Sequence, residues 1–294
     1  MAGPGPSRGG TRASRRRVPS RAALVSVGRR ELFTWDDEVL YHPRPHARLL
    51  ASDMSDRENL FRPIHKGIRT MLYDLGSRLQ TTDFADVAES NQFVSQLKKD
   101  LEGSLSNCIL CLLRAHSGHE ENDIFSRLRV HDPDAIDLMM REHAEAARRI
   151  YGVAKTCDEI LTLTSSARRV EVGDRLDLEV NDLCAFYLSH MNNEEATLVP
   201  LLWERFTDEQ LRAMRAEFYD NLPLSLFETW MRWTLPSLNQ EELVVLFSGL
   251  KKGPGTARFP DWVRMAHKTL DVDRWIGLRE RVDLDVASGT RGPR

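Results

Sequence analysis

Residues 115–125 read AHSGHEENDIF and residues 189–199 read SHMNNEEATLV, so the pattern His-x-x-x-Glu-Glu occurs twice in the chain. Side chains four positions apart share one face of an α-helix, so the first glutamate of each motif faces the same way as its histidine. Apolar residues continue that face at three- and four-residue spacings, which predicts two amphipathic helices that bury it. These motifs decide the fold, because a buried carboxylate needs partners from neighbouring helices.

The first glutamates of the two motifs, Glu120 and Glu194, are the reason to expect a bound metal. An ionised carboxylate without a cationic partner costs several kcal/mol to bury, and neither motif supplies a Lys or Arg on the same face. A pair of metal ions would satisfy both carboxylates. Imidazole and carboxylate groups are ligands that suit non-haem iron or manganese, and bundles build such centres from facing helices.

The chain around these motifs predicts four long amphipathic helices in succession. We expect them at residues 58–79, 93–128, 132–162 and 175–206. The second is expected to break near Gly103 or Gly118, and Pro200 is expected to kink the fourth. Long helices joined by short connections are typical of an all-α, up-down-up-down four-helix bundle.

Each of the four predicted helices carries a histidine in its apolar stripe. These histidines are His65, His116, His143 and His190. A single histidine at the buried edge of a helix is most often a hydrogen-bonded core residue. Four of them on four successive helices, together with two glutamates, favour a metal centre inside the bundle.

The predicted bundle spans residues 54–206, and the parts of the chain on either side of it differ from it in composition. Residues 1–53 are rich in Gly, Pro, Ser and Arg without hydrophobic periodicity, so we expect a disordered N-terminal extension. A transit peptide and a nucleic-acid-binding tail are alternative interpretations of its arginines. Residues 207–286 predict a C-terminal helical extension, and residues 287–294 a frayed tail.

The predicted C-terminal extension consists of shorter helices and is rich in tryptophan. We expect these helices at residues 208–219, 226–233, 239–250 and 259–270. Five of the six tryptophans lie in this part of the chain or at its edge. We expect them to cover the bundle; docking of a protein partner through the Trp-rich helices is the alternative.

Composition and charge exclude several classes of protein. The eight arginines among residues 1–30 leave a net charge of −11 on the rest of a chain whose total charge is −3. The acidic body argues against nucleic-acid binding, and the chain has no apolar run long enough for a membrane span. The four cysteines, including the Cys108-x-x-Cys111 pair within a predicted helix, are expected to be packed thiols in the reducing cytoplasm.

Four ordered motifs resemble the hemerythrin-like cation-binding domain, and specifically its histidine-poor branch. They read PIHKGI (63–68), AHSGHEENDIF (115–125), REHAEAARRI (141–150) and SHMNNEEATLVPLLWERF (189–206). The resemblance implies a non-haem di-iron centre in a four-helix bundle. It implies that His65, His116, His143 and His190 are terminal ligands and that Glu120 and Glu194 bridge the two metals. Manganese is an alternative metal.

The chain departs from the oxygen-carrying members of this family at two places. Those proteins have a second histidine one turn after the third-helix ligand, where this chain has Ala147, and a shorter Asp where it offers Glu194 and Glu195. We therefore expect water, Glu142 or Glu195 to complete the coordination shell of one metal ion. Reversible oxygen carriage is not expected. Iron-responsive ubiquitin-ligase subunits belong to the same branch, but the chain has neither an F-box nor a zinc-ligating Cys/His array.

The predicted function is binding or sensing of oxygen or iron by a di-iron protein, with dioxygen or another small diatomic as its ligand. Two alternatives belong to other classes. The centre could turn over as an oxidase, a peroxidase or a protein that repairs iron centres. Alternatively, the bundle is a helical interaction module without metal.

Overall fold

A computed structural model describes residues 1, 3, 57–102, 109–253 and 256–284. Over these ranges the secondary structure is helical, without a strand, as the all-α prediction requires. Within the same ranges, no helix combines the length and the hydropathy that crossing a membrane requires. The predicted N-terminal extension, its boundary at Met54, Gly103 and the C-terminal tail lie outside the described residues.

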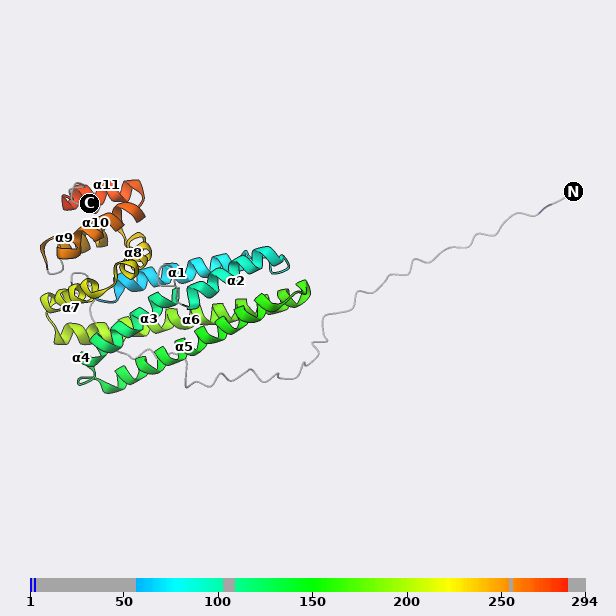
Figure 1. Cartoon of the computed structure of the whole chain (residues 1–294), viewed down its shortest axis with the longest axis horizontal. Helices are drawn as coiled ribbons and strands as arrows, with labels where there is room; N and C mark the ends of the chain where they lie inside the picture. The colour runs from blue at the N-terminus through cyan, green and yellow to red at the C-terminus, as the bar shows by residue number, and fades with distance from the viewer. Residues whose placement is uncertain (2, 4–56, 103–108, 254–255, 285–294) are drawn as a thin grey trace. The chain divides into compact units, whose positions relative to one another are not determined.

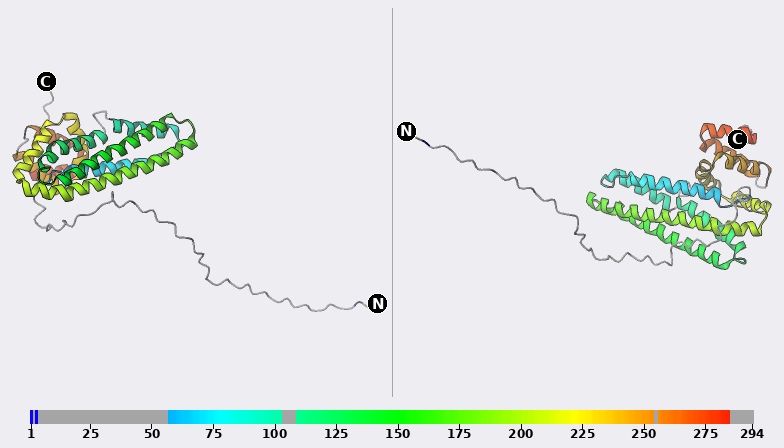
Figure 2. Two further views of the ribbon diagram at one scale, coloured as in Figure 1. Left: turned by 90° about the horizontal axis from the view of Figure 1, so that it is seen from below. Right: turned by 180° about the vertical axis from the view of Figure 1, so that it is seen from behind.

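The bundle consists of four helical segments that lie side by side in Figure 1 and in both views of Figure 2. Each segment, whether one helix or several in a row, is called a layer below. The first is α1 (Arg62–Gln80); the second consists of α2 (Val87–Glu102), α3 (Ile109–His119), the π-helical segment η1 (Glu120–Phe125) and α4 (Ser126–Leu128); the third is α5 (Pro133–Thr162); the fourth is α6 (Ser166–Arg205). As expected, Pro133 opens α5, and the side chain of Asp132 caps it by accepting from Ala135 N.

Two helix boundaries differ from the predicted ones. The fourth helix begins at Ser166 instead of residue 175, because the Ser165 side chain accepts from Arg168 N and caps it. The second layer begins at Val87 instead of residue 93. Gly118 lies inside α3, so it does not break the helix; the departure from α-helical geometry follows at Glu120. Pro200 lies within α6.

The C-terminal helices gather at one end of the bundle in Figures 1 and 2. They are α7 (Asp208–Asn221), α8 (Leu224–Ser237), α9 (Gln240–Lys252), the short 3-10 turn η2 (Thr256–Arg258), α10 (Phe259–Thr269) and α11 (Val272–Val282). Reciprocal capping boxes open α7, with Thr207 and Gln210, and α9, with Asn239 and Glu242. α8 packs against α1, and it also contacts α3 and α10.

Two buried apolar clusters lie on either side of a group of buried polar side chains in the bundle. The larger cluster includes Met191 on α6 and continues into the C-terminal helices through Trp230 and Trp262. The smaller cluster includes Leu198 on α6. The buried Glu194 lies between Met191 and Leu198 on α6, so apolar side chains of the two clusters lie on both sides of it along the helix.

A glycine allows α8 to approach α1 closely. A Cβ atom added at Gly67 would lie 2.9 Å from Thr234 Oγ1 and 3.0 Å from the Thr234 Cα and N atoms. Two of these three atoms belong to the backbone of α8, so a side chain at position 67 could be accommodated only if the helix moved. Gly76, on the same helix, has nothing within 4 Å of its added Cβ.

We predict that Gly67→Ala and Gly76→Ala have opposite effects on stability. Gly67→Ala should lower the free energy of unfolding by about 1–3 kcal/mol, the usual cost of overpacking. Gly76→Ala should raise it by about 0.5–1 kcal/mol, because alanine is the better helix former. Denaturant unfolding of the full chain measures both. Equal effects of the two substitutions would show that the α1–α8 contact does not constrain position 67.

Candidate metal centre

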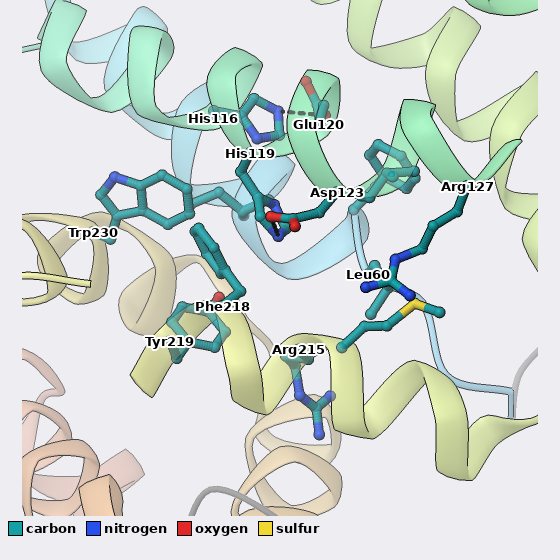
Figure 3. A pocket seen from close by; sticks show the side chains of 14 residues that line it. Leu60, His116, His119, Glu120, Asp123, Arg127, Arg215, Phe218, Tyr219 and Trp230 are labelled. Carbon is teal, nitrogen blue, oxygen red and sulfur yellow. Dashed lines mark ion pairs between the residues drawn. The ribbon is translucent and has the colours of Figure 1, made fainter. Parts of the chain in front are cut away.

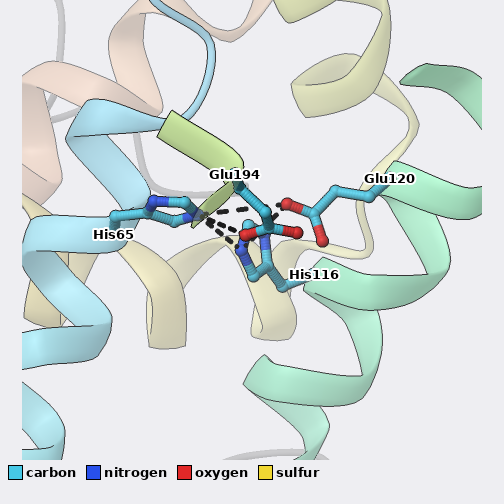
Figure 4. A group of neighbouring side chains, drawn as sticks. All are labelled: His65, His116, Glu120 and Glu194. Atoms are coloured by element: carbon cyan, nitrogen blue, oxygen red, sulfur yellow. Dashed lines mark hydrogen bonds and ion pairs between the residues drawn. The ribbon is translucent and has the colours of Figure 1, made fainter. Parts of the chain in front are cut away.

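The structure brings all six residues predicted as metal ligands into one buried group. They are His65 from α1, His116 from α3, Glu120 from η1, His143 from α5, and His190 and Glu194 from α6. The four helical layers thus contribute at least one side chain each. In Figure 4 the side chains of His65, His116, Glu120 and Glu194 point toward a common centre from three of these layers.

The six residues form two overlapping groups that could each hold a cation. One group, here called site A, consists of His65, His116, Glu120 and Glu194. The other, site B, consists of Glu120, His143, His190 and Glu194. Within each group, the nitrogen or oxygen atoms that could bind a metal all lie within 4.8 Å of one another. Each site therefore has two imidazoles of its own, and both glutamates belong to both sites.

Each glutamate turns one oxygen toward each site. Glu120 Oε1 lies 3.1 Å from His116 Nε2 in site A, and Glu120 Oε2 lies 3.3 Å from His143 Nε2 in site B. Glu194 Oε2 lies 3.3 Å from His65 Nε2, and Glu194 Oε1 lies 3.1 Å from His190 Nε2. This is the arrangement of two carboxylates that could bridge a pair of metal ions.

The π-helical segment lies at the point where the second layer enters the centre. It begins at Glu120, four residues after His116, and it buries Glu120, Ile124 and Phe125. A π-helical turn has a wider backbone, and such turns are frequent at functional sites. The predicted i, i+4 relation places Glu120 beside His116, but the sequence pattern did not reveal this widening.

Three further glutamates contact the Nδ1 atoms of three of the predicted ligand histidines. Glu195 Oε1 lies 2.8 Å from His65 Nδ1, Glu121 Oε1 lies 2.8 Å from His143 Nδ1, and Glu142 Oε2 lies 2.7 Å from His190 Nδ1. A carboxylate accepts from the Nδ1–H group and so leaves Nε2 directed into the centre, which is the usual support of a metal-binding histidine. Arg69 in turn donates to Glu195.

These contacts change the expected roles of several residues. Glu142 and Glu195, predicted to complete a metal shell, contact histidine Nδ1 atoms from outside the two sites. Glu121 was not predicted as a functional residue, although the Glu-Glu pair repeated in both motifs was the available signal. Ala147 is exposed while the neighbouring Ala146 is buried, so position 147 does not face the bundle interior.

Burial and charge act in opposite directions on the histidines. Burial alone would lower the pKa of His65, His143 and His190. Contacts with the glutamates outweigh it, and raise the pKa of His65 and His190 to about 10 and that of His143 to about 9. His116 is the exception, because burial lowers its pKa to about 4 despite the nearby charge of Glu120.

The buried glutamates remain ionised in this environment. Burial and their mutual repulsion would raise the pKa of each carboxyl group. The imidazoles outweigh both effects, with His116 the main one at Glu120 and His190 at Glu194, so both pKa values lie below the ordinary range.

The donor set fits a pair of cations. Both oxygens of Glu120, both oxygens of Glu194 and Nε2 of His143 are buried and have no hydrogen bond of acceptable geometry among the described residues. Imidazole nitrogens of the predicted ligands lie at ion-pair distances from the carboxylate oxygens. Cations between these atoms would satisfy all of them at once, and mixed imidazole and carboxylate ligands suit iron, manganese or zinc.

Comparison with known proteins agrees with this geometry. Residues 57–202 match the family described as the Hemerythrin HHE cation binding domain. A zinc finger protein BRUTUS-like of Arabidopsis thaliana is 24% identical over 196 residues, which cover 64% of this chain and 14% of that relative. The matched region is thus a small part of that curated relative's length. No solved structure matches the chain.

We predict that the metal-free protein loses stability as the pH rises from about 7 to about 10. The pKa values of His65, His143 and His190 are raised above the ordinary value of 6.5. The stability that they contribute is therefore fully present below pH 6.5 and is lost as the pH passes through 9 to 10. Denaturant midpoints measured across this range test the prediction.

Two variants isolate the contribution of the centre to this pH dependence. His190→Gln should weaken it, because one of the three raised groups is removed. His131→Gln should leave it unchanged, since His131 is exposed. Stability that stays level or increases between pH 7 and pH 10 in the unsubstituted protein would contradict the prediction.

Proposed function

Residues 57–202 belong to the hemerythrin HHE cation-binding domain family, and we propose that they hold two iron ions in a centre that binds dioxygen or a similar diatomic. The observation that carries the proposal is the pair of sites sharing both buried glutamates. His65 and His116 would hold one ion, His143 and His190 the other, and Glu120 and Glu194 would bridge them. Manganese is the alternative metal that this donor set supports.

The surrounding residues have distinct roles in this proposal. A pair of iron ions, when bound, supplies the redox electrons and open coordination positions that uptake of a diatomic requires. Glu195, Glu121 and Glu142 hold the imidazoles of His65, His143 and His190 in position through their Nδ1 atoms. The apolar clusters on either side exclude water from the six predicted ligands. Charge interactions among these residues are stronger as a result.

The same arrangement supports a role as a sensor of iron or oxygen. All four helical layers contribute ligands, so metal binding would stabilise the bundle as a whole by mass action. Removal of the metal would leave a centre whose charges are balanced only by protons on the histidines. Occupancy of the centre would therefore be reported as a change in bundle stability.

We predict that the full chain, expressed with added iron, contains about two irons per chain, one for each of the two sites. Glu120→Gln and Glu194→Gln remove a bridging charge with little change of volume, and each should lower the iron content by half or more. Glu204→Gln, at an exposed position of the same helix as Glu194, should leave it unchanged. Metal analysis and near-ultraviolet absorption of purified protein measure these effects.

The outcomes separate the proposal from its rivals. Fewer than one iron per chain, with full stability of the metal-free protein, would favour a helical interaction module. Iron binding with steady consumption of dioxygen or peroxide would favour an oxidase or peroxidase. Iron content that is insensitive to both bridging substitutions would overturn the assignment of the centre.

A further inference from the structure

A cavity of about 30 Å³ lies beside site A. His116 and Glu120 contribute to its lining, so it reaches the metal-binding groups themselves. Figure 3 shows the cavity between the second layer of the bundle, which carries His119 and Asp123, and α7, which carries Phe218 and Tyr219. A buried water needs roughly 10–15 Å³. The cavity therefore has room for a ligand of two or three atoms.

The outer wall of the cavity comes from the C-terminal extension. Met214, Arg215, Phe218 and Tyr219 from α7 and Trp230 from α8 line it. These residues lie beyond residues 57–202, the range that matches the family. The bundle alone would therefore leave this side of site A without its wall.

Aromatic packing places this wall against the centre. The Phe218 ring lies 3.7 Å from the His119 ring between centroids, and 5.1 Å from the Trp230 ring. The Trp230 ring in turn lies edge-on to His116, with a centroid distance of 6.2 Å. A continuous row of rings therefore runs from α7 to a ligand of site A.

Ion pairs at the start of the described chain hold α7 in place. Arg215 donates to the Glu58 carboxylate, and Arg57 pairs with Asp208 at 3.1 Å. Gly67 permits the close approach of α8 to α1 on the same side. The wall is therefore anchored to the bundle at both α7 and α8.

The lining favours an uncharged ligand. Leu60, Phe61, Ile64, Phe218 and Trp230 provide its apolar part. Among its charged groups, Arg215 is neutralised by Glu58, and Asp123 lies 3.5 Å from His119. Arg127 is exposed. Glu120 also lines the cavity, but its two oxygens face His116 and His143. An ion in the apolar part would therefore lose its hydration without a partner there.

We propose that this cavity is the binding site for a small uncharged diatomic beside site A, and that Phe218 of the extension sets the upper limit on ligand size. The inference rests on the proposed function, because the ligand is the one taken up by the centre. It assigns to the C-terminal helices the role of selecting that ligand. Met214 borders the same cavity and contributes to the limit from the same helix.

The test compares ligands of two sizes on the iron-loaded full chain. Nitric oxide is the diatomic probe, and tert-butyl isocyanide is the bulky one. Phe218→Ala should increase affinity for the isocyanide about tenfold or more, the effect expected when a steric block is removed, and change nitric oxide affinity by less than about threefold. Phe259→Ala removes another half-buried phenylalanine of the extension, away from the cavity, and should behave like the unsubstituted protein.

The results that overturn the inference are specific. Isocyanide binding that is equally strong in the unsubstituted protein and in Phe218→Ala would show that Phe218 sets no size limit. Met214→Ala provides a second enlargement of the same wall, should Phe218→Ala fail to fold. Its isocyanide affinity should also rise, and an unchanged value would overturn the inference.

Failure of the proposed function is recognised separately, by iron content measured on the same samples. If the protein holds iron and nitric oxide but the two wall variants leave the size limit unchanged, only the inference fails. If it holds no iron, xenon-pressurised crystals of the metal-free protein test the cavity directly. Xenon bound beside Phe218 would support an uncharged-ligand site, and absence of xenon there would overturn it.

Discussion

Two negative charges inside a dry helical bundle are the constraint on which the structure depends. Glu120 and Glu194 are fully buried between two apolar clusters, where an unpaired carboxylate is unfavourable by several kcal/mol. Neither has an arginine or lysine ion-pair partner among the described residues; the groups around both are imidazoles. Each helical layer must therefore present a histidine at the same depth, and this requirement sets the positions of the four layers relative to one another.

An outer ring of carboxylates extends this constraint. Glu195, Glu121 and Glu142 each come from a different layer than the histidine that they contact. The contacts therefore connect neighbouring layers around the bundle while they orient the imidazoles. His116 differs from the other three histidines, because its imidazole lies near Trp230. At His116, the C-terminal extension therefore occupies the place that an outer glutamate takes at the other three histidines.

Much of the fold, and the grouping of the four histidines with Glu120 and Glu194, could be predicted from local sequence. The i, i+4 pairs of His116 with Glu120 and His190 with Glu194 depend only on helix geometry, and each histidine lay in a recognisable apolar stripe. The outer contacts could not be predicted in this way, because the partner of Glu121 depends on how two helices are rotated about their axes. The π-helical turn and the Gly67–Thr234 approach also depend on tertiary packing. The early start of α6 was missed because Ser165 lies in a Thr/Ser run that is equally typical of a loop.

The anchoring of α7 by Arg57 and Glu58 has a consequence for the order in which the protein is assembled. A ribosome releases all six residues of the buried group before it releases Met214, Phe218 and Trp230. Until α7 emerges and pairs with residues 57 and 58, and α8 packs against α1, the His116 side of the nascent bundle lacks this cover. Vectorial synthesis therefore completes the four helices of the predicted centre before the segment that covers their His116 side.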